Sequence, residues 1–472
     1  MTAFSLEPAR LAWCAELRTL AAERLRPLAE KGEPGRVDRS LLAELGALGL
    51  LSRLFASGAL DLCLMRESLA HACTEAETAL ALQGLGAHPV HAHGTAAQRA
   101  RWLPGVSDGS VVAAFALSEP GAGSDAAALS LTAEPAVRPG PTGTTGRDTT
   151  TSDAPDAWTG PAVPPRGAGT PDAVARDAAA RGGPARAGET PTGAGAQSPG
   201  PVAGPAGPAP DVSARGAETE TAPAPASPAA HPDGRSGWRL TGEKRWISNA
   251  PEADFYTVFA RTTPGAGARG VTAFLVPADR PGLTGSALDM LSPHPIGALR
   301  FDAVPVTADD VLGEVDQGFR VAMDTLNLFR PSVGAFAVGM AQAALDATLA
   351  HTARRDAFGG KLKDLQSVAH QVAEMALRTE SARLMVYAAA TAYDEGADGV
   401  PGRAAMAKLL ATETAQYVVD RAVQLHGARA LQRGHLLEHL YREVRAPRVY
   451  EGASEVQRGI IAKELYRNLE DR

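Results

Sequence analysis

The chain has 472 residues, 44% of them hydrophobic, and a formal net charge of −7 at pH 7. That length is sufficient for a large buried core and for two or three domains. The charge balance is mildly acidic, and no basic block or stripe of Lys and Arg among aromatic residues is present. These features exclude a nucleic-acid-binding protein.

Cysteine usage and hydropathy bear on the compartment. Cys14, Cys63 and Cys73 share no metal-ligand spacing and cannot form a disulfide framework, so we expect a reducing compartment and no metal site. The opening MTAFSLEPAR lacks a basic patch followed by an apolar run, and no segment offers about 18 uninterrupted apolar residues. We therefore expect a cytoplasmic protein that does not span a membrane.

Three regions with different patterns of apolar and turn residues follow one another along the chain. Apolar residues at three-and-four spacing predict an α-helical N-terminal domain over 1–113. From Ser110 onwards, short β-rich runs bounded by turn residues, such as SVVAAFALSEP and GVTAFLVPA, predict a small middle β-barrel or sandwich domain over 114–313. The remainder, 314–472, is helical again, so the fold class is α+β.

The C-terminal domain is expected to be a four-helix bundle. Apolar residues from Phe319 to Met340 recur at helical spacing and predict one long helix over 318–354, which Pro331 should bend. The further helices are expected at about 361–396, 402–426 and 435–469.

Residues 135–236 differ from everything around them. They include no Leu, Ile, Met, Phe, Tyr, Cys or Lys, a single aromatic residue, Trp158, and more than half of the chain's 35 prolines. Such a stretch cannot bury enough apolar surface to offset the entropy of ordering it, so we expect a disordered insertion. ALSLTAE before it and GWRLTGEK after it resemble two strands of one hairpin, which can tolerate a long loop. The insertion is either a solvated spacer or a docking tether for a partner.

Three short stretches suit a cofactor, although each has a simpler structural explanation. AFALSEPGAGSD, residues 114–125, has glycines and Ser124 that can form an anion-binding nest, but it also fits a plain turn. GEKRWISNA, residues 242–250, offers an indole, a β-branched side chain and a hydroxyl to a planar heterocycle, or a tryptophan to the core. ARRDAFGGKLKDLQ, residues 353–366, offers arginines to phosphates or to surface salt bridges.

A fourth stretch, VYEGASEVQR at 449–458, places Glu451 between an aromatic residue and a glycine, just ahead of a predicted terminal helix. Two roles are open for this carboxylate. It can cap the helix, or it can be the base of an active site.

Taken in order, these stretches resemble the flavin-dependent acyl-CoA dehydrogenases. The resemblance covers nearly everything outside 135–236, and its motifs are ALSEPGAGSD, GEKRWISNA, FRPSVGAFAVGMAQAALD, RRDAFGGKLKDLQ, QLHG and YEGASEVQRGIIAKEL. The fold of that family is an α-helical domain, a middle β domain and a C-terminal four-helix bundle. This agrees with the architecture predicted from the spacing of apolar and turn residues along the chain.

The resemblance implies FAD as the cofactor and assigns residues to it by position. The flavin ring would be contacted by Phe115, Leu117, Ser118, Trp246, Ile247 and Ser248, and the phosphates and the CoA end of the substrate by Gly123 and Ser124. The adenine half, which in this family a neighbouring subunit commonly holds, would be contacted by Arg355, Phe358, Gln366, Gln424 and Gly427. A homotetramer, or at least a dimer, is therefore implied.

The remaining assignments surround the predicted base. Glu451 falls on the position of the family's catalytic base, Arg330 and Gly452 would frame the substrate together with Ser124, and Ala453 stands at a cofactor-side position where the family usually has a threonine. Glu451 would take the α-proton of an acyl thioester while a β-hydride leaves for flavin N5, which gives a trans-2-enoyl thioester. The thioester would be carried on CoA or on an acyl-carrier protein, with an electron-transfer flavoprotein as the electron acceptor.

The chain also departs from the family pattern. Ala428, Asp356 and Ala357 replace residues that usually touch the cofactor, and Asn327 and Phe329 replace the aspartate and threonine of straight-chain members. Two alternatives therefore stay open. One is an acyl-CoA oxidase or flavin monooxygenase on the same fold, and the other is a non-catalytic binding or scaffold protein.

Overall fold

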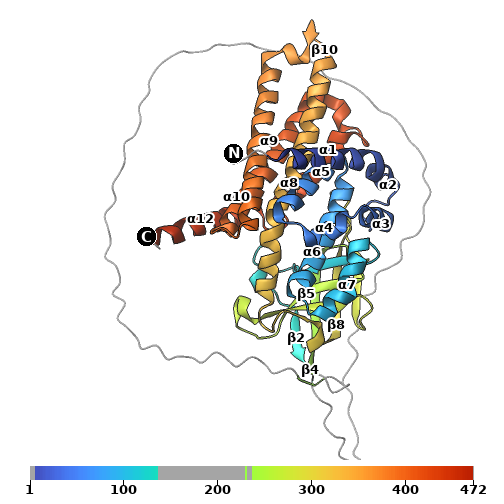
Figure 1. The fold of residues 1–472 in the computed structure, drawn as a ribbon, viewed down its shortest axis with the longest axis vertical. Coiled ribbons are helices and arrows are strands. Elements are labelled where there is room, and N and C mark those ends of the chain that lie inside the picture. The colour runs from blue at the N-terminus through green and yellow to red at the C-terminus, as the bar shows by residue number, and fades with distance from the viewer. Residues whose placement is uncertain (1–5, 137–228, 231–235, 471–472) are drawn as a thin grey trace, which may run out of the picture. The chain divides into compact units, whose positions relative to one another are not determined.

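Helices form the N-terminal part of the protein (Figure 1). The computed structural model describes residues 6–136, 229–230 and 236–470. Its first helices are α1 (Pro8–Leu20), α2 (Arg26–Ala29), α3 (Arg39–Ala47), α4 (Leu50–Ala56), α5 (Ala59–Ala72), α6 (Thr74–His93) and α7 (Ala96–Asp108). Local sequence fixes the ends of α7, because Thr95 and Gln98 form a capping box at its start and Gly109 follows it with a φ of 80°.

The middle of the chain forms one sheet. Its strands are β1 (Ala113–Ala116), β2 (Thr132–Pro135), β3 (Ala229–Ala230), β4 (Ser236–Ser248), β5 (Phe255–Arg261), β6 (Val271–Pro277), β7 (Leu283–Ala287), β8 (Ile296–Thr307) and β9 (Val311–Leu312). The order is β7-β8-β4-β2-β5-β6-β9, with β1 paired to β5 and β3 to β4. Strands β5 and β6 are buried almost throughout, because helices contact them as well as neighbouring strands.

The hairpin expected on either side of the insertion is confirmed. Strand β2 pairs antiparallel with β4, with Thr132 opposite Thr241 and Pro135 opposite Trp238. The insertion itself, expected to be disordered over 135–236, lies almost entirely outside the described residues.

A long helix, α8 (Gly318–Arg354), links the sheet to the C-terminal helices and confirms the predicted bounds. It passes through Pro331 without a break and packs against α5, α9 (Gln366–Asp394) and α10 (Val400–His426) (Figure 1). By length and composition α8 could cross a membrane, but most of its apolar window is buried inside the protein, as in the core helix of a globular fold. Its far end leads into a short hairpin of β10 (Asp356–Ala357) and β11 (Gly360–Lys361).

The expectation of a single helix over 435–469 is wrong. The structure has two helices there, α11 (Leu436–Glu443) and α12 (Ser454–Glu470). Pro447 cannot donate a helical hydrogen bond, and Gly452 adopts a φ of 91°, so the chain leaves the helical path between them. Glu451 lies in this interruption and not within a helix.

Candidate active site

A buried ion pair fixes the loop that carries several predicted site residues. Lys244 of β4 is fully buried, and its Nζ donates to Glu119 Oε1 at 2.8 Å and to the Leu117 carbonyl at 2.9 Å. Glu119 Oε2 accepts from the Ser130 backbone N–H at 2.6 Å, and Glu119 Oε1 also accepts from the Leu131 N–H at 3.0 Å. A single carboxylate therefore ties the loop after β1 to β4 and to the start of β2.

This pair brings together the two groups of residues expected against the flavin ring. The Arg245 backbone N–H donates to the Ser118 carbonyl at 3.0 Å. Ser118, in the loop after β1, therefore lies beside the start of the Trp246–Ile247–Ser248 segment of β4. Trp246 interrupts the β4–β8 register with a φ of 59°, and its indole is 45% exposed. Ile247, by contrast, points into the core and is 1% exposed. The bulge thus turns the indole outward and leaves the isoleucine as a packing residue.

The glycine-rich loop after this strand is open to the solvent. Gly123 and Ser124 are both exposed, and a Cβ built on Gly121 or Gly123 would meet no atom within 4 Å. Phe115 and Leu117 are buried, and the Phe115 ring packs against Phe259 with the centroids 4.9 Å apart. The loop can therefore accept a ligand at its backbone, while the strand behind it is part of the core.

The predicted base lies on a strained turn. Glu451 has a φ of 50° and Gly452 a φ of 91°. Gln457, which is fully buried on α12, donates from Nε2 to the Gly452 carbonyl at 2.9 Å and to the Glu451 carbonyl at 3.3 Å. The buried Oε2 of Glu451 has no hydrogen-bond partner in the described chain. The side chain therefore does not cap α12, which excludes the simpler of the two roles considered above.

Three cations surround this carboxylate, although within the described residues none forms an ion pair with it. Burial raises the pKa of Glu451, and the charges of Arg66, Lys408 and Arg330 oppose that rise. Arg330 is 6% exposed, and its Nε also lacks a hydrogen-bond partner in the described chain. The charges of Glu451 and Arg330 therefore interact, and each side chain has a buried polar atom without a hydrogen-bond partner in the described chain.

Arg66 reaches the site from α5. Its Nε pairs with Glu77 of α6, and its Nη1 donates to Ser332 Oγ of α8 at 2.6 Å. Only 3% of Arg66 is exposed, so this cation is held in the helical core at the meeting point of α5, α6 and α8. Its charge acts on Glu451 together with the charges of Lys408 and Arg330.

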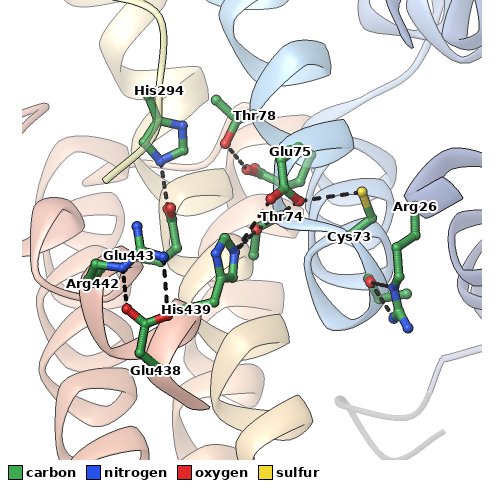
Figure 2. A network of polar contacts seen from close by, with 12 residues as sticks. Arg26, Cys73, Thr74, Glu75, Thr78, His294, Glu438, His439, Arg442 and Glu443 are labelled. Carbon is green, nitrogen blue, oxygen red and sulfur yellow. Dashed lines mark hydrogen bonds and ion pairs between the residues drawn. The ribbon is translucent and has the colours of Figure 1, made fainter. Parts of the chain in front are cut away.

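A polar network secures α11 just before the Glu451 turn (Figure 2). His294, in the segment before β8, lies 2.6 Å from Glu443 at the end of α11, and Thr74 of α6 lies 2.6 Å from His439. Burial lowers the pKa of His294, but the adjacent Glu443 carboxylate outweighs burial, so the pKa is raised overall. The N-terminal helices, the sheet and α11 are thereby joined in one place.

The residues expected to hold the adenine half of the cofactor form a separate, exposed group at the far end of α8. These are Arg355, Phe358, Gln366, Gln424 and Gly427, and the Phe358 ring is 90% exposed. Arg355 also lines a cavity of about 570 Å³, together with the Asp356 carboxylate and with histidines and arginines that include His351, His426, Arg354 and Arg429. The His351 and His426 rings stack with centroids 4.2 Å apart. Burial and the neighbouring arginines lower the pKa of His351, so its environment favours an anion over a further cation.

Sequence reasoning missed the buried cations. Lys408 and Arg66 lie in largely apolar helical stretches, AAMAKLLA and LCLMRESLA, whereas Lys244 lies in the mixed strand sequence LTGEKRWIS. A charged residue at a core position of a helix was the available signal, because such residues are rarely buried without a partner. This signal does not identify a buried cation by itself, because Lys and Arg also interrupt apolar runs on solvent-exposed helix faces.

Three family models match the chain, described as Acyl-CoA dehydrogenase N-terminal domain over residues 8–110, middle domain over 216–304 and C-terminal domain over 316–466. Over 222 residues the chain is 36% identical to the probable acyl-CoA dehydrogenase FadE25 of Mycobacterium tuberculosis, which is 46% of this chain and 57% of that relative. Over 234 residues it is 40% identical to the mitochondrial short-chain specific acyl-CoA dehydrogenase of Bos taurus, covering 49% and 56%. The chain thus spans a little over half the length of the curated relatives that it matches.

Solved structures extend the likeness to the whole fold. The butyryl-CoA dehydrogenase of Megasphaera elsdenii superposes with a TM-score of 0.73 at 25% identity, over 98% of this chain and 99% of that one. PigA, solved with FAD and proline, superposes with a TM-score of 0.73 at 22% identity, over 98% of both chains, and this second likeness concerns the fold alone.

Proposed function

The chain belongs to the acyl-CoA dehydrogenase family, and on that premise we propose that it is an FAD-dependent enzyme that oxidises an acyl thioester between its α and β carbons. The observation that carries this proposal is the Glu451 carboxylate. It is buried at Oε2, free of hydrogen bonds in the described chain, and surrounded by three cations. A group left in this state suits proton removal better than it suits stability.

Glu451 would act as the base. An α-proton next to a thioester is weakly acidic, so the base must be close, desolvated and of raised pKa. Burial supplies the last two conditions, and the charges of the three cations oppose the rise in the pKa of Glu451. The Glu451 backbone N–H would meet the charge that develops on the thioester oxygen. The expected product is a trans-2-enoyl thioester.

The residues near β4 fit a flavin. The exposed Trp246 indole offers a stacking face, and the loop at Gly121 and Gly123 allows close approach of phosphate oxygens to the backbone. FAD, when bound, would supply the hydride acceptor. Ser118, in the loop after β1, and Ser248, at the end of β4, are half-buried and can donate hydrogen bonds at the ring edge.

The adenine half of FAD would be bound by a second copy of the chain. Helix α8 has 37 residues, which is about 55 Å at the usual rise per residue. Trp246 belongs to the sheet at one end of α8, and Arg355 and Phe358 lie at the other end (Figure 1). A single dinucleotide cannot bridge that length, so a dimer or tetramer would complete each site.

The thioester carrier and the electron acceptor are further parts of the proposal. CoA or an acyl-carrier protein would deliver the acyl group, and an electron-transfer flavoprotein would accept the electrons. Both are proposed from the family pattern and not from contacts in this chain.

A spectroscopic experiment tests the function. The purified protein should show an oxidised-flavin band that bleaches on anaerobic addition of acyl-CoA thioesters, and mass spectrometry should find a thioester lighter by two hydrogens. A flavin band that no CoA or carrier-protein thioester bleaches would contradict the proposal, and rapid return of the band with oxygen would favour the oxidase alternative. A colourless protein that cannot be loaded with FAD would favour the scaffold alternative.

A further inference from the structure

The turn that carries Glu451 is fastened to helix α10 at two places. Glu413 of α10 accepts from Ser454 Oγ at 2.6 Å and from Arg448 Nε at 3.0 Å, on either side of the turn. Between these contacts, Lys408 Nζ donates to the Gly452 carbonyl at 2.6 Å. Both ends of the turn are therefore held by Glu413 and its middle by Lys408, two side chains of α10.

Lys408 shares its acceptor with Gln457. The Gly452 carbonyl receives one hydrogen bond from the Lys408 ammonium and one, at 2.9 Å, from Gln457 Nε2. A carbonyl oxygen has two lone pairs, so both are used. This double contact holds the backbone at the point where Glu451 and Gly452 adopt positive φ, a conformation that persists only where its surroundings determine it.

Stability alone does not account for the ammonium, because a fully buried lysine carries a large desolvation cost. Burial lowers the pKa of Lys408 to about 8, and the Glu451 carboxylate is the largest of the charges that oppose this effect. The charged groups facing Lys408 are Glu451, Arg330, Glu413 and Glu455. Those acting on Glu451 are Arg66, Lys408 and Arg330.

From this geometry we infer that Lys408 is a positioning residue for the catalytic base, which fixes the Gly452 carbonyl and supplies a positive charge behind the Glu451 carboxylate. The inference rests on the proposed function, because it concerns the same base. It assigns two separable effects to one side chain. The hydrogen bond orients the turn, and the charge favours the ionised form of Glu451.

Two substitutions separate these effects. Lys408→Gln keeps a hydrogen-bond donor for the Gly452 carbonyl but removes the charge, whereas Lys408→Arg keeps the charge. The rate of flavin bleaching by an acyl-CoA thioester is measured against pH by anaerobic stopped flow, with flavin content and thermal unfolding recorded in parallel. We expect the acidic limb of the Lys408→Gln profile to move upward by about one pH unit, with about a tenfold lower rate on that limb. Lys408→Arg should leave the limb within a few tenths of a unit of wild type.

The outcomes are distinct. A Lys408→Gln rate that falls by the same factor at every pH, with the limb unmoved, would overturn the inference and leave Lys408 as a structural residue. A Lys408→Gln rate equal to that of wild type at every pH would also overturn the inference. If Lys408→Gln does not fold, Lys408→Arg must fold and keep the wild-type limb, and a moved limb there overturns the inference. Failure of the wild-type protein to bleach with any thioester would instead refute the proposed function.

Discussion

At the residue scale, Glu451 is controlled by opposing electrostatic effects. Burial disfavours its charged form and raises its pKa, while Arg66, Lys408 and Arg330 favour the charged form. No ion pair with any of them appears in the described chain, so the charge is stabilised at a distance and the oxygen atoms stay available. A base arranged in this way is ready for a proton from a substrate that lies against it.

The balance predicts the pH dependence of the wild-type enzyme. Only the ionised carboxylate can accept the α-proton, so the rate of flavin bleaching should rise with pH through the pKa of Glu451. Because burial raises that pKa, the midpoint of the rise should lie above the ordinary value of 4.5. Stopped-flow bleaching between pH 5 and about pH 8 measures the midpoint. A rate that is flat across this range, with the midpoint at 4.5 or lower, would contradict the assigned environment.

At the element scale, the loop after β1 depends on one buried ion pair. Lys244→Met would leave the Glu119 carboxylate buried without its cation, and breaking such a pair costs about 3–5 kcal/mol. The loop between Leu117 and Ser124 should loosen with it. We therefore expect a lower free energy of unfolding and loss of FAD on gel filtration.

Chemical denaturation and the ratio of flavin to protein absorbance check this prediction. Lys31→Met is the matched control, because Lys31 is exposed in the N-terminal helical region. Its unfolding curve and flavin content should equal those of wild type. Equal stability of Lys244→Met and the Lys31 control would show that the ion pair does not hold the loop.

How far the sequence predicts these elements depends on the kind of signal. The bounds of α8 follow from a long apolar repeat, and the β2–β4 pairing follows from alternating runs around the insertion. The break between α11 and α12 was missed, since it is set by Pro447 and a left-handed glycine within an otherwise helical pattern. Glu451 could be identified by its motif. Lys408 could not be linked to it, because only the fold brings α10 beneath the turn.

At the scale of the whole molecule, the predicted cofactor residues fall into two groups on opposite ends of α8 (Figure 1). If a second copy completes the site, two different defects should complement each other. Trp246→Ala removes the flavin-side indole, and Arg355→Glu reverses a charge on the adenine side. Each variant alone should lose FAD. Co-expressed, they should form mixed dimers in which one of the two sites is intact, so the isolated mixed dimer should regain about half of the wild-type flavin content.

The check is the flavin absorbance of the mixed oligomer, isolated through two different affinity tags. Co-expression of two copies of the same variant is the control and should stay colourless. If each variant alone retains flavin, or if the mixed oligomer regains none, the shared-site arrangement is wrong.

The central claim is that Glu451 is the base of an acyl-thioester dehydrogenase, and one comparison tests it directly. Glu451→Gln keeps the shape of the side chain and removes its proton-accepting charge, while Glu455→Gln changes a carboxylate on the exposed face of α12. Both should bind FAD, and anaerobic acyl-CoA should bleach the flavin of wild type and Glu455→Gln. Bleaching of Glu451→Gln should be slower by at least about a thousandfold, in line with the loss of a general base. Bleaching of Glu451→Gln at the wild-type rate would contradict the claim.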